Sequence, residues 1–195
     1  ILEEAIQQNA GLIVAHHPIV FSGLKKLTGK NYVERTVLKA IKNDIAIFAA
    51  HTNLDAVWGG VNTKICEILE LENCKVLNPV SGQLKKLVTF IPREAADKVR
   101  EAVFTAGAGN IGEYDFCGYN LEGTGSFRAG DDANPYIGEK GEIHYEKEIR
   151  FETIFPAWLQ GKVINALINA HPYEEVAYDI YPLENNYEKA GIGMI

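Results

Sequence analysis

Two apolar stretches of the sequence, residues 12–15 and 46–50, each end in side chains that can bind a metal ion. These side chains are His16 and His17 after the first stretch, and His51 and Asp55 after the second. Imidazole and carboxylate groups are the ligands that zinc and similar divalent ions accept. Because ligands of open α/β sheets bind outside the carboxyl ends of the strands, the pattern predicts a metal site at one sheet edge.

The residues alone leave alternatives open at each of these positions. Successive side chains of a strand point to opposite faces, but Pro18 keeps His17 extended, so two neighbouring imidazoles past the strand end can reach different ions. Asp55 is equally typical of an Asx turn or a helix cap. His51 is placed either to bind an ion or to donate a hydrogen bond to a ligand.

Residues 1–83 alternate between apolar strands and amphipathic helices. The expected strands are 11–15 and 45–50, and the expected helices are 2–9, 32–43 and 62–71. Strands separated by helices of this length predict an α/β domain with a parallel sheet, in which the metal-binding residues share one edge.

Residues 84–183 have a different rhythm, after a turn cluster at 78–82. Strands at 84–91, 114–121, 142–154 and 176–181, with helices at 93–104 and after Pro156, give the order β-α-β-β-α-β. This is the α+β ferredoxin-like unit, whose ends emerge close together, so it can be inserted into another domain. We therefore expect a host domain at 1–83, an insert at 84–183 and a return to the host at 184–195.

Two segments of the expected insert are weaker candidates for ligand binding. The glycine-rich run Gly123–Arg128 carries a basic side chain that suits an anion, although a β-bulge or hairpin turn explains the glycines better. His171 and Pro172 precede two glutamates, and this stretch is interpreted as a structural bend first and as a secondary metal or ligand site second.

Composition and charge limit the partners and the location that can be expected for this protein. The net charge is −7, and it lies in residues 84–195, because residues 1–83 hold eight basic and eight acidic side chains. An acidic surface repels phosphate backbones, so nucleic-acid binding is not expected. The charge is compatible with a single nucleotide held at a metal ion, because the ion supplies its own positive field. No apolar run is long enough to cross a membrane. The three cysteines form no Cys-x-x-Cys pair, which fits a reducing cytoplasm.

Residues 11–21, 50–55 and 59–62 together resemble the GTP cyclohydrolase type-2 homologues, also called NIF-three-like proteins. The second half is similar to the PII- and CutA-like insert of bacterial members, most clearly over residues 170–179. The resemblance implies a ring-shaped homohexamer with two divalent ions per subunit, zinc or iron. His16, His17 and Asp55 then fall on metal ligands of the family.

The resemblance also implies a further histidine and glutamate ligand after the insert, and residues 186–195 contain no histidine. On this basis we expect a chain truncated at both ends. The implied function is hydrolysis by a water whose pKa the metals lower, with C8 of guanine as the point of attack on GTP. No residue is assigned as the general base. The alternative is a non-catalytic regulatory or scaffold protein whose insert senses a ligand or mediates assembly.

Overall fold

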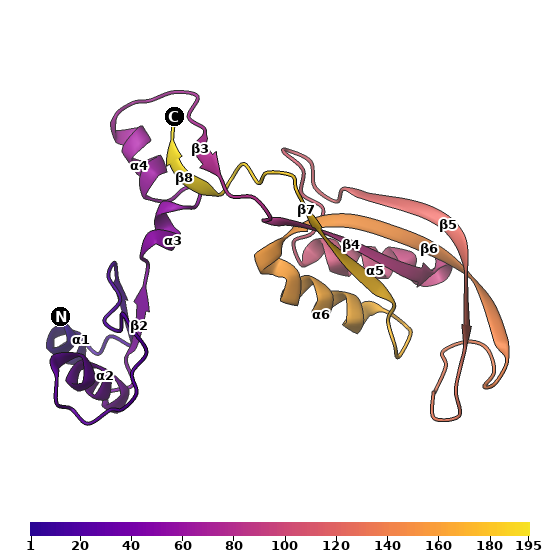
Figure 1. Cartoon of the computed structure of the whole chain (residues 1–195), viewed down its shortest axis with the longest axis horizontal. Coiled ribbons are helices and arrows are strands. Elements are labelled where there is room, and N and C mark those ends of the chain that lie inside the picture. The colour runs from indigo at the N-terminus through magenta and orange to yellow at the C-terminus, as the bar shows by residue number, and fades with distance from the viewer. The chain divides into compact units, whose positions relative to one another are not determined.

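The computed structural model describes all 195 residues, which form a mixed α/β fold of two compact units (Figure 1). Unit 1 comprises Ile1–Pro79 and Glu188–Ile195, and unit 2 comprises Val80–Tyr187. The sequence analysis set the corresponding boundaries at residues 83 and 184. No helix combines the length and the apolar character that crossing a membrane requires.

Unit 1 is built around a parallel pair of strands. Its elements are α1 (Leu2–Gln7), β1 (Leu12–Ala15), α2 (Tyr32–Lys42), β2 (Ala46–Ala49), α3 (Thr52–Asp55), α4 (Val61–Ile68), β3 (Val76–Pro79) and β8 (Gly191–Met194). Strands β1 and β2 pair in parallel, with Leu12 opposite Ala46 and Ala15 opposite Ala49. The predicted parallel pairing is therefore confirmed.

A second, antiparallel pair in unit 1 joins β3 to β8, with Pro79 opposite Gly191. The sequence analysis placed residues 78–82 in a turn cluster and expected no strand there. This interpretation was wrong for residues 78 and 79, because the strand is defined by a partner far downstream rather than by its own pattern.

The loop between β1 and α2 is tied to the helix by a buried glutamate, Glu34, which is 4% exposed. Asn31 caps α2 by accepting a hydrogen bond from the Glu34 backbone N–H, at 2.8 Å. The Glu34 carboxylate in turn accepts hydrogen bonds from the side chain and backbone of Thr28, at 2.8 and 2.7 Å, and from the Lys30 backbone. These bonds lower the pKa of Glu34, with the Thr28 hydroxyl as the largest cause.

Unit 2 has the predicted β-α-β-β-α-β order. Its elements are β4 (Leu84–Pro92), the 3₁₀ turn η1 (Arg93–Ala95), α5 (Ala96–Thr105), β5 (Gly118–Arg128), β6 (Ile143–Pro156), the 3₁₀ turn η2 (Ala157–Leu159), α6 (Gln160–Ala170) and β7 (Tyr178–Leu183). The strands form one antiparallel sheet in the order β5-β6-β4-β7.

The glycine-rich segment Gly123–Arg128 is neither a bulge nor a turn. It continues β5 and pairs residue by residue with β6, from Gly123 opposite Glu148 to Arg128 opposite Ile143. The interpretation as an irregular turn was therefore wrong, because a long partner strand holds these glycines in a regular ladder.

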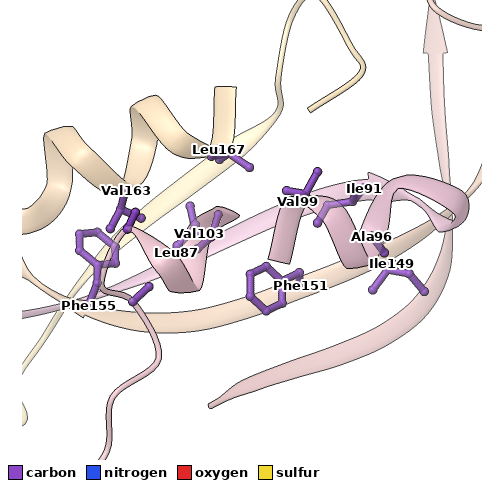
Figure 2. Packing of buried hydrophobic residues seen from close by; sticks show 12 residues of the cluster. Leu87, Ile91, Ala96, Val99, Val103, Ile149, Phe151, Phe155, Val163 and Leu167 are labelled. Atoms are coloured by element: carbon purple, nitrogen blue, oxygen red, sulfur yellow. The ribbon is translucent and has the colours of Figure 1, made fainter. Parts of the chain in front are cut away.

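The core of unit 2 lies between the sheet and helices α5 and α6 (Figure 2). Leu87 of β4 and Phe151 of β6 are fully buried against Val99 and Val163 of the two helices. Since successive side chains of a strand alternate between faces, Glu148 and Arg150 point to the opposite face of the sheet from Phe151.

Replacing Phe151 with alanine should destabilise unit 2 by about 3–5 kcal/mol, because the ring is fully buried and its removal leaves a cavity. Urea unfolding followed by circular dichroism measures the change. Tyr119→Ala on β5 is the matched control, since its ring is 65% exposed, and it should shift the midpoint little. Equal losses in the two variants would contradict this description of the core.

Replacing Glu34 with glutamine should destabilise unit 1 at neutral pH, because an amide replaces one acceptor by a donor that faces other donors. The folded state lowers the pKa of Glu34 below its ordinary value of 4.5. The stabilisation is therefore present above that value and is lost as the pH falls through and below it. Urea midpoints of the wild type and the variant should converge at acidic pH, while the exposed Glu4→Gln control shows no such trend.

Candidate metal centre

The register of β1 and β2 continues past their last paired residues and aligns the histidines that follow. The Ala50 N–H donates a hydrogen bond to the Ala15 carbonyl at 2.8 Å, one residue beyond the paired strands. His16 therefore lies beside Ala50, and His17 lies beside His51. Parallel strands that end at one sheet edge have brought together residues 34 positions apart in the sequence, as the predicted topology requires.

Three imidazole rings form a cluster at this edge. One ring nitrogen from each of His16, His17 and His51 lies within 4.8 Å of those of the other two. The ring centroids are 4.7 Å apart for His16 and His17, and 5.4 and 5.3 Å from His51 to these two rings. His16 and His17 are exposed to solvent and His51 is half-buried, so small molecules can reach the cluster.

The orientation of His16 is set by the backbone of the neighbouring strand end. Its Nδ1 lies 3.1 Å from the carbonyl oxygen of Ala50. A carbonyl oxygen only accepts hydrogen bonds, so Nδ1 is the donor, and in the neutral form of the ring the lone pair lies on Nε2. A metal-binding histidine typically has its second nitrogen held in this way.

His51 belongs to the cluster because of the backbone at the start of α3. It occupies the N-cap position with φ −89° and ψ −135°, and its side chain makes no capping hydrogen bond. Its ring is instead directed toward the other two imidazoles and contacts the ring of Phe21 edge-on, at 6.1 Å. The sequence analysis left the role of His51 open and gave Phe21 none, because neither side-chain direction follows from local spacing.

Asp55 lies outside the group of three histidines. It ends α3, four residues after His51, and its side chain is half-buried. Asn62 at the start of α4 donates a hydrogen bond to the Asp55 backbone carbonyl at 2.7 Å, which fixes the end of this helical turn.

The three imidazoles suit a zinc-like divalent ion. Sites with three histidines leave a fourth position open for water or substrate. Ligand nitrogens around a tetrahedral ion are about 3.3 Å apart at the usual bond length, so small side-chain rotations would close the observed spacing. A pair of ions would need further ligands, above all carboxylates. Asp55 is the carboxylate among the metal ligands that the sequence analysis predicted.

Comparison with known proteins identifies the family of this chain. The profile of the Duf34/NIF3 (NGG1p interacting factor 3) family matches residues 1–173. Proteins named GTP cyclohydrolase 1 type 2 homolog from Bacillus subtilis and Halalkalibacterium halodurans are 47% and 45% identical to this chain over its full length. The match covers 52% and 53% of those two proteins, so the chain spans about half the length of these curated relatives.

A solved structure gives the same result for the fold. The crystal structure of a Bacillus cereus protein related to NIF3 is 47% identical, with a TM-score of 0.74. The alignment covers 99% of this chain and 51% of that protein. The family profile spans both the strands that carry the histidines and most of unit 2, and the chain therefore belongs to the Duf34/NIF3 family.

Proposed function

We propose that this protein is a metal-dependent hydrolase whose metal ions lie at the carboxyl ends of β1 and β2. His16, His17 and His51 hold one divalent ion, zinc or iron. Asp55 serves a second ion together with ligands from outside these 195 residues. The observation that carries the proposal is the convergence of three imidazoles at one sheet edge, with the Nε2 of His16 left free by the Ala50 carbonyl.

The protein's own residues position and expose such a site. The Ala50 carbonyl holds the tautomer of His16, and the backbone of α3 directs His51 toward its partners. When bound, a divalent ion supplies Lewis acidity and makes water a nucleophile at neutral pH. Because His16 and His17 are exposed, a substrate as large as a nucleotide can approach them.

The name of the curated relatives, GTP cyclohydrolase 1 type 2 homolog, supports GTP as the first substrate to test. In that reaction one water would add to C8 of guanine and open the five-membered ring, giving a product heavier than GTP by one water. A homohexamer remains the assembly that we expect of the whole protein.

Metal binding by the three histidines can be measured directly. Cobalt(II) titrated into the protein should give d–d absorption bands of a four-coordinate ion, with about one ion per chain, because three imidazoles complete one set of protein ligands. His51→Ala should weaken this binding at least about tenfold. His144→Ala in unit 2 removes a histidine outside the cluster and should leave the titration unchanged. Equal binding by the His51 variant would exclude His51 as a ligand.

The second prediction concerns turnover. The whole protein, which supplies the remaining ligands of the second ion, should convert GTP to the species with one added water when it is given Zn²⁺ or Fe²⁺. Liquid chromatography with mass spectrometry measures this conversion. Asp55→Ala should abolish this conversion, because one carboxylate ligand of the second ion is lost. Asp115→Ala, an exposed aspartate of unit 2, should retain it. Undiminished turnover in the Asp55 variant would reject its role, and unchanged GTP at full metal loading would reject the substrate.

A further inference from the structure

Unit 2 contains a cavity of about 620 Å³ whose lining includes none of the three clustered histidines. Its lining includes residues of β5, of the loop that follows β5 and of the segment that precedes β7. The two segments that the sequence analysis singled out in this half, Gly123–Arg128 and the stretch after His171, both contribute to it. Glu148 and Arg150 of β6 complete the lining, on the face of the sheet opposite the helices.

A carboxylate with little exposure lies in this cavity. Glu148 is 9% exposed, and one of its oxygens accepts a hydrogen bond from the Tyr173 hydroxyl at 3.0 Å. Burial, and then the neighbouring Glu148, raise the pKa of Tyr173 well above its ordinary value of 10.0, so the hydroxyl keeps its proton and remains the donor. The hydroxyl donates to Oε1, which leaves Oε2 of Glu148 as an acceptor for another donor.

Glycine at position 125 makes room for that carboxylate. A Cβ atom built on Gly125 would overlap Oε2 of Glu148, so any other residue at this position would require the carboxylate to move. The glycine-rich sequence of β5 thus serves to admit an acidic group, whereas the sequence analysis connected it with an anion.

Aromatic rings form the walls around Glu148. The ring of Tyr173 lies 6.0 Å from that of Phe127 and 6.1 Å from that of Tyr136, centroid to centroid. Phe90 adds a fourth ring to the lining, and the Arg150 guanidinium already lies over it, 5.9 Å from the ring centroid. Faces of such rings attract cations, most strongly where water is excluded.

His171 holds this arrangement in place and is not a metal ligand. Its Nε2 donates a hydrogen bond to the Phe90 carbonyl at 3.0 Å, and its Nδ1 accepts one from the Tyr173 N–H at 3.1 Å. Both ring nitrogens are therefore used, and burial lowers the pKa of His171, which favours this neutral form. The structural interpretation of the histidine-proline bend agrees with these contacts.

The charges around the cavity favour a cation over an anion. The lining contains four glutamates and two arginines: Glu122, Glu148, Glu174, Glu175, Arg128 and Arg150. Residues outside the lining pair with one charge of each sign: Glu152 lies 2.8 Å from the Nε of Arg150, and Arg93 lies 3.5 Å from a carboxylate oxygen of Glu122. Three glutamates and one arginine of the lining have no ion pair, so the negative charge still prevails. An acidic cavity with aromatic walls is complementary to a flat positive ligand.

We propose that this cavity binds a small planar organic cation of the amidinium class. The N–H edge of the ligand would donate to the free oxygen of Glu148, and its faces would lie against the aromatic rings. Such a paired, charge-assisted contact is stronger than a neutral hydrogen bond. The proposal does not depend on the metal centre or on GTP as a substrate.

The test uses benzamidine as the probe and benzamide as its neutral counterpart of nearly the same shape. In isothermal titration calorimetry on the full chain, benzamidine should bind and benzamide should bind at least about tenfold more weakly. Glu148→Gln should reduce benzamidine affinity at least about tenfold as well. Glu113→Gln, an exposed glutamate outside the cavity, is the matched control and should match the wild type.

A second variant keeps the proposal testable if Glu148→Gln fails to fold. Tyr136 is 55% exposed, so Tyr136→Leu should fold normally, yet it removes one aromatic wall and should weaken benzamidine about threefold or more. Circular dichroism verifies the fold of each variant. Equal binding of the two probes, or affinity indifferent to both substitutions, would overturn the proposal.

Sedimentation velocity in the same solutions identifies the rival occupant of the cavity, a second copy of this chain. A sedimentation coefficient that stays the same with and without benzamidine, while the probe binds, supports the small-molecule site. Self-association that Glu148→Gln or Tyr136→Leu disrupts, with no heat from benzamidine, assigns the cavity to a chain-to-chain interface and overturns the proposal.

Discussion

Everything proposed for unit 1 depends on the parallel register of β1 and β2. Neighbouring strands lie about 4.8 Å apart. When two strands end at the same edge, the residues that follow them therefore lie at roughly the spacing that the ligands of one ion require. With Ala15 opposite Ala49, the histidines that follow meet one another. A shift of one residue would reverse the faces to which every side chain of one strand points and would separate His17 from His51.

Two buried carboxylates of the chain illustrate the difference between a structural and an available acceptor. Glu34 accepts hydrogen bonds from Thr28, Lys30 and Asn31, so its acceptor capacity is used to order a loop. Glu148 accepts one from Tyr173 and lines a cavity. A carboxylate that is supplied with several internal donors has little acceptor capacity left for a ligand, whereas one with a single donor retains lone pairs for another donor.

Much of the fold could be predicted from the sequence because it follows from short-range patterns. The apolar strands at 12–15 and 46–49, helix α2 and the order of elements in unit 2 are all visible in local periodicity. The predictions that were wrong concern segments whose structure depends on strands far away in the sequence. Strand β3 exists through its pairing with β8, and the glycines at 123–125 stay in a strand because β6 runs alongside them.

The candidate site could be predicted less completely for the same reason. The sequence places His16, His17 and His51 after strands, but only the backbone dihedral angles at His51 decide that its ring joins the others while Asp55 lies a helical turn away. Likewise, local spacing gives no indication that the segments at 123–128 and 173–175 share a cavity, since two strands, β6 and β4, lie between β5 and β7 in the sheet.

The junctions between the two units have an evolutionary consequence. The chain leaves unit 1 at Pro79 and re-enters it beside Gly191, which is the antiparallel partner of Pro79. Within unit 2, the first residue of β4, Leu84, likewise pairs with the last residue of β7, Leu183. The segments that enter and leave unit 2 therefore pair with each other. Recombination could replace the whole unit with a tight turn or with another domain. Descendants could gain or lose the amidinium cavity in one genetic event while inheriting the histidine cluster unaltered.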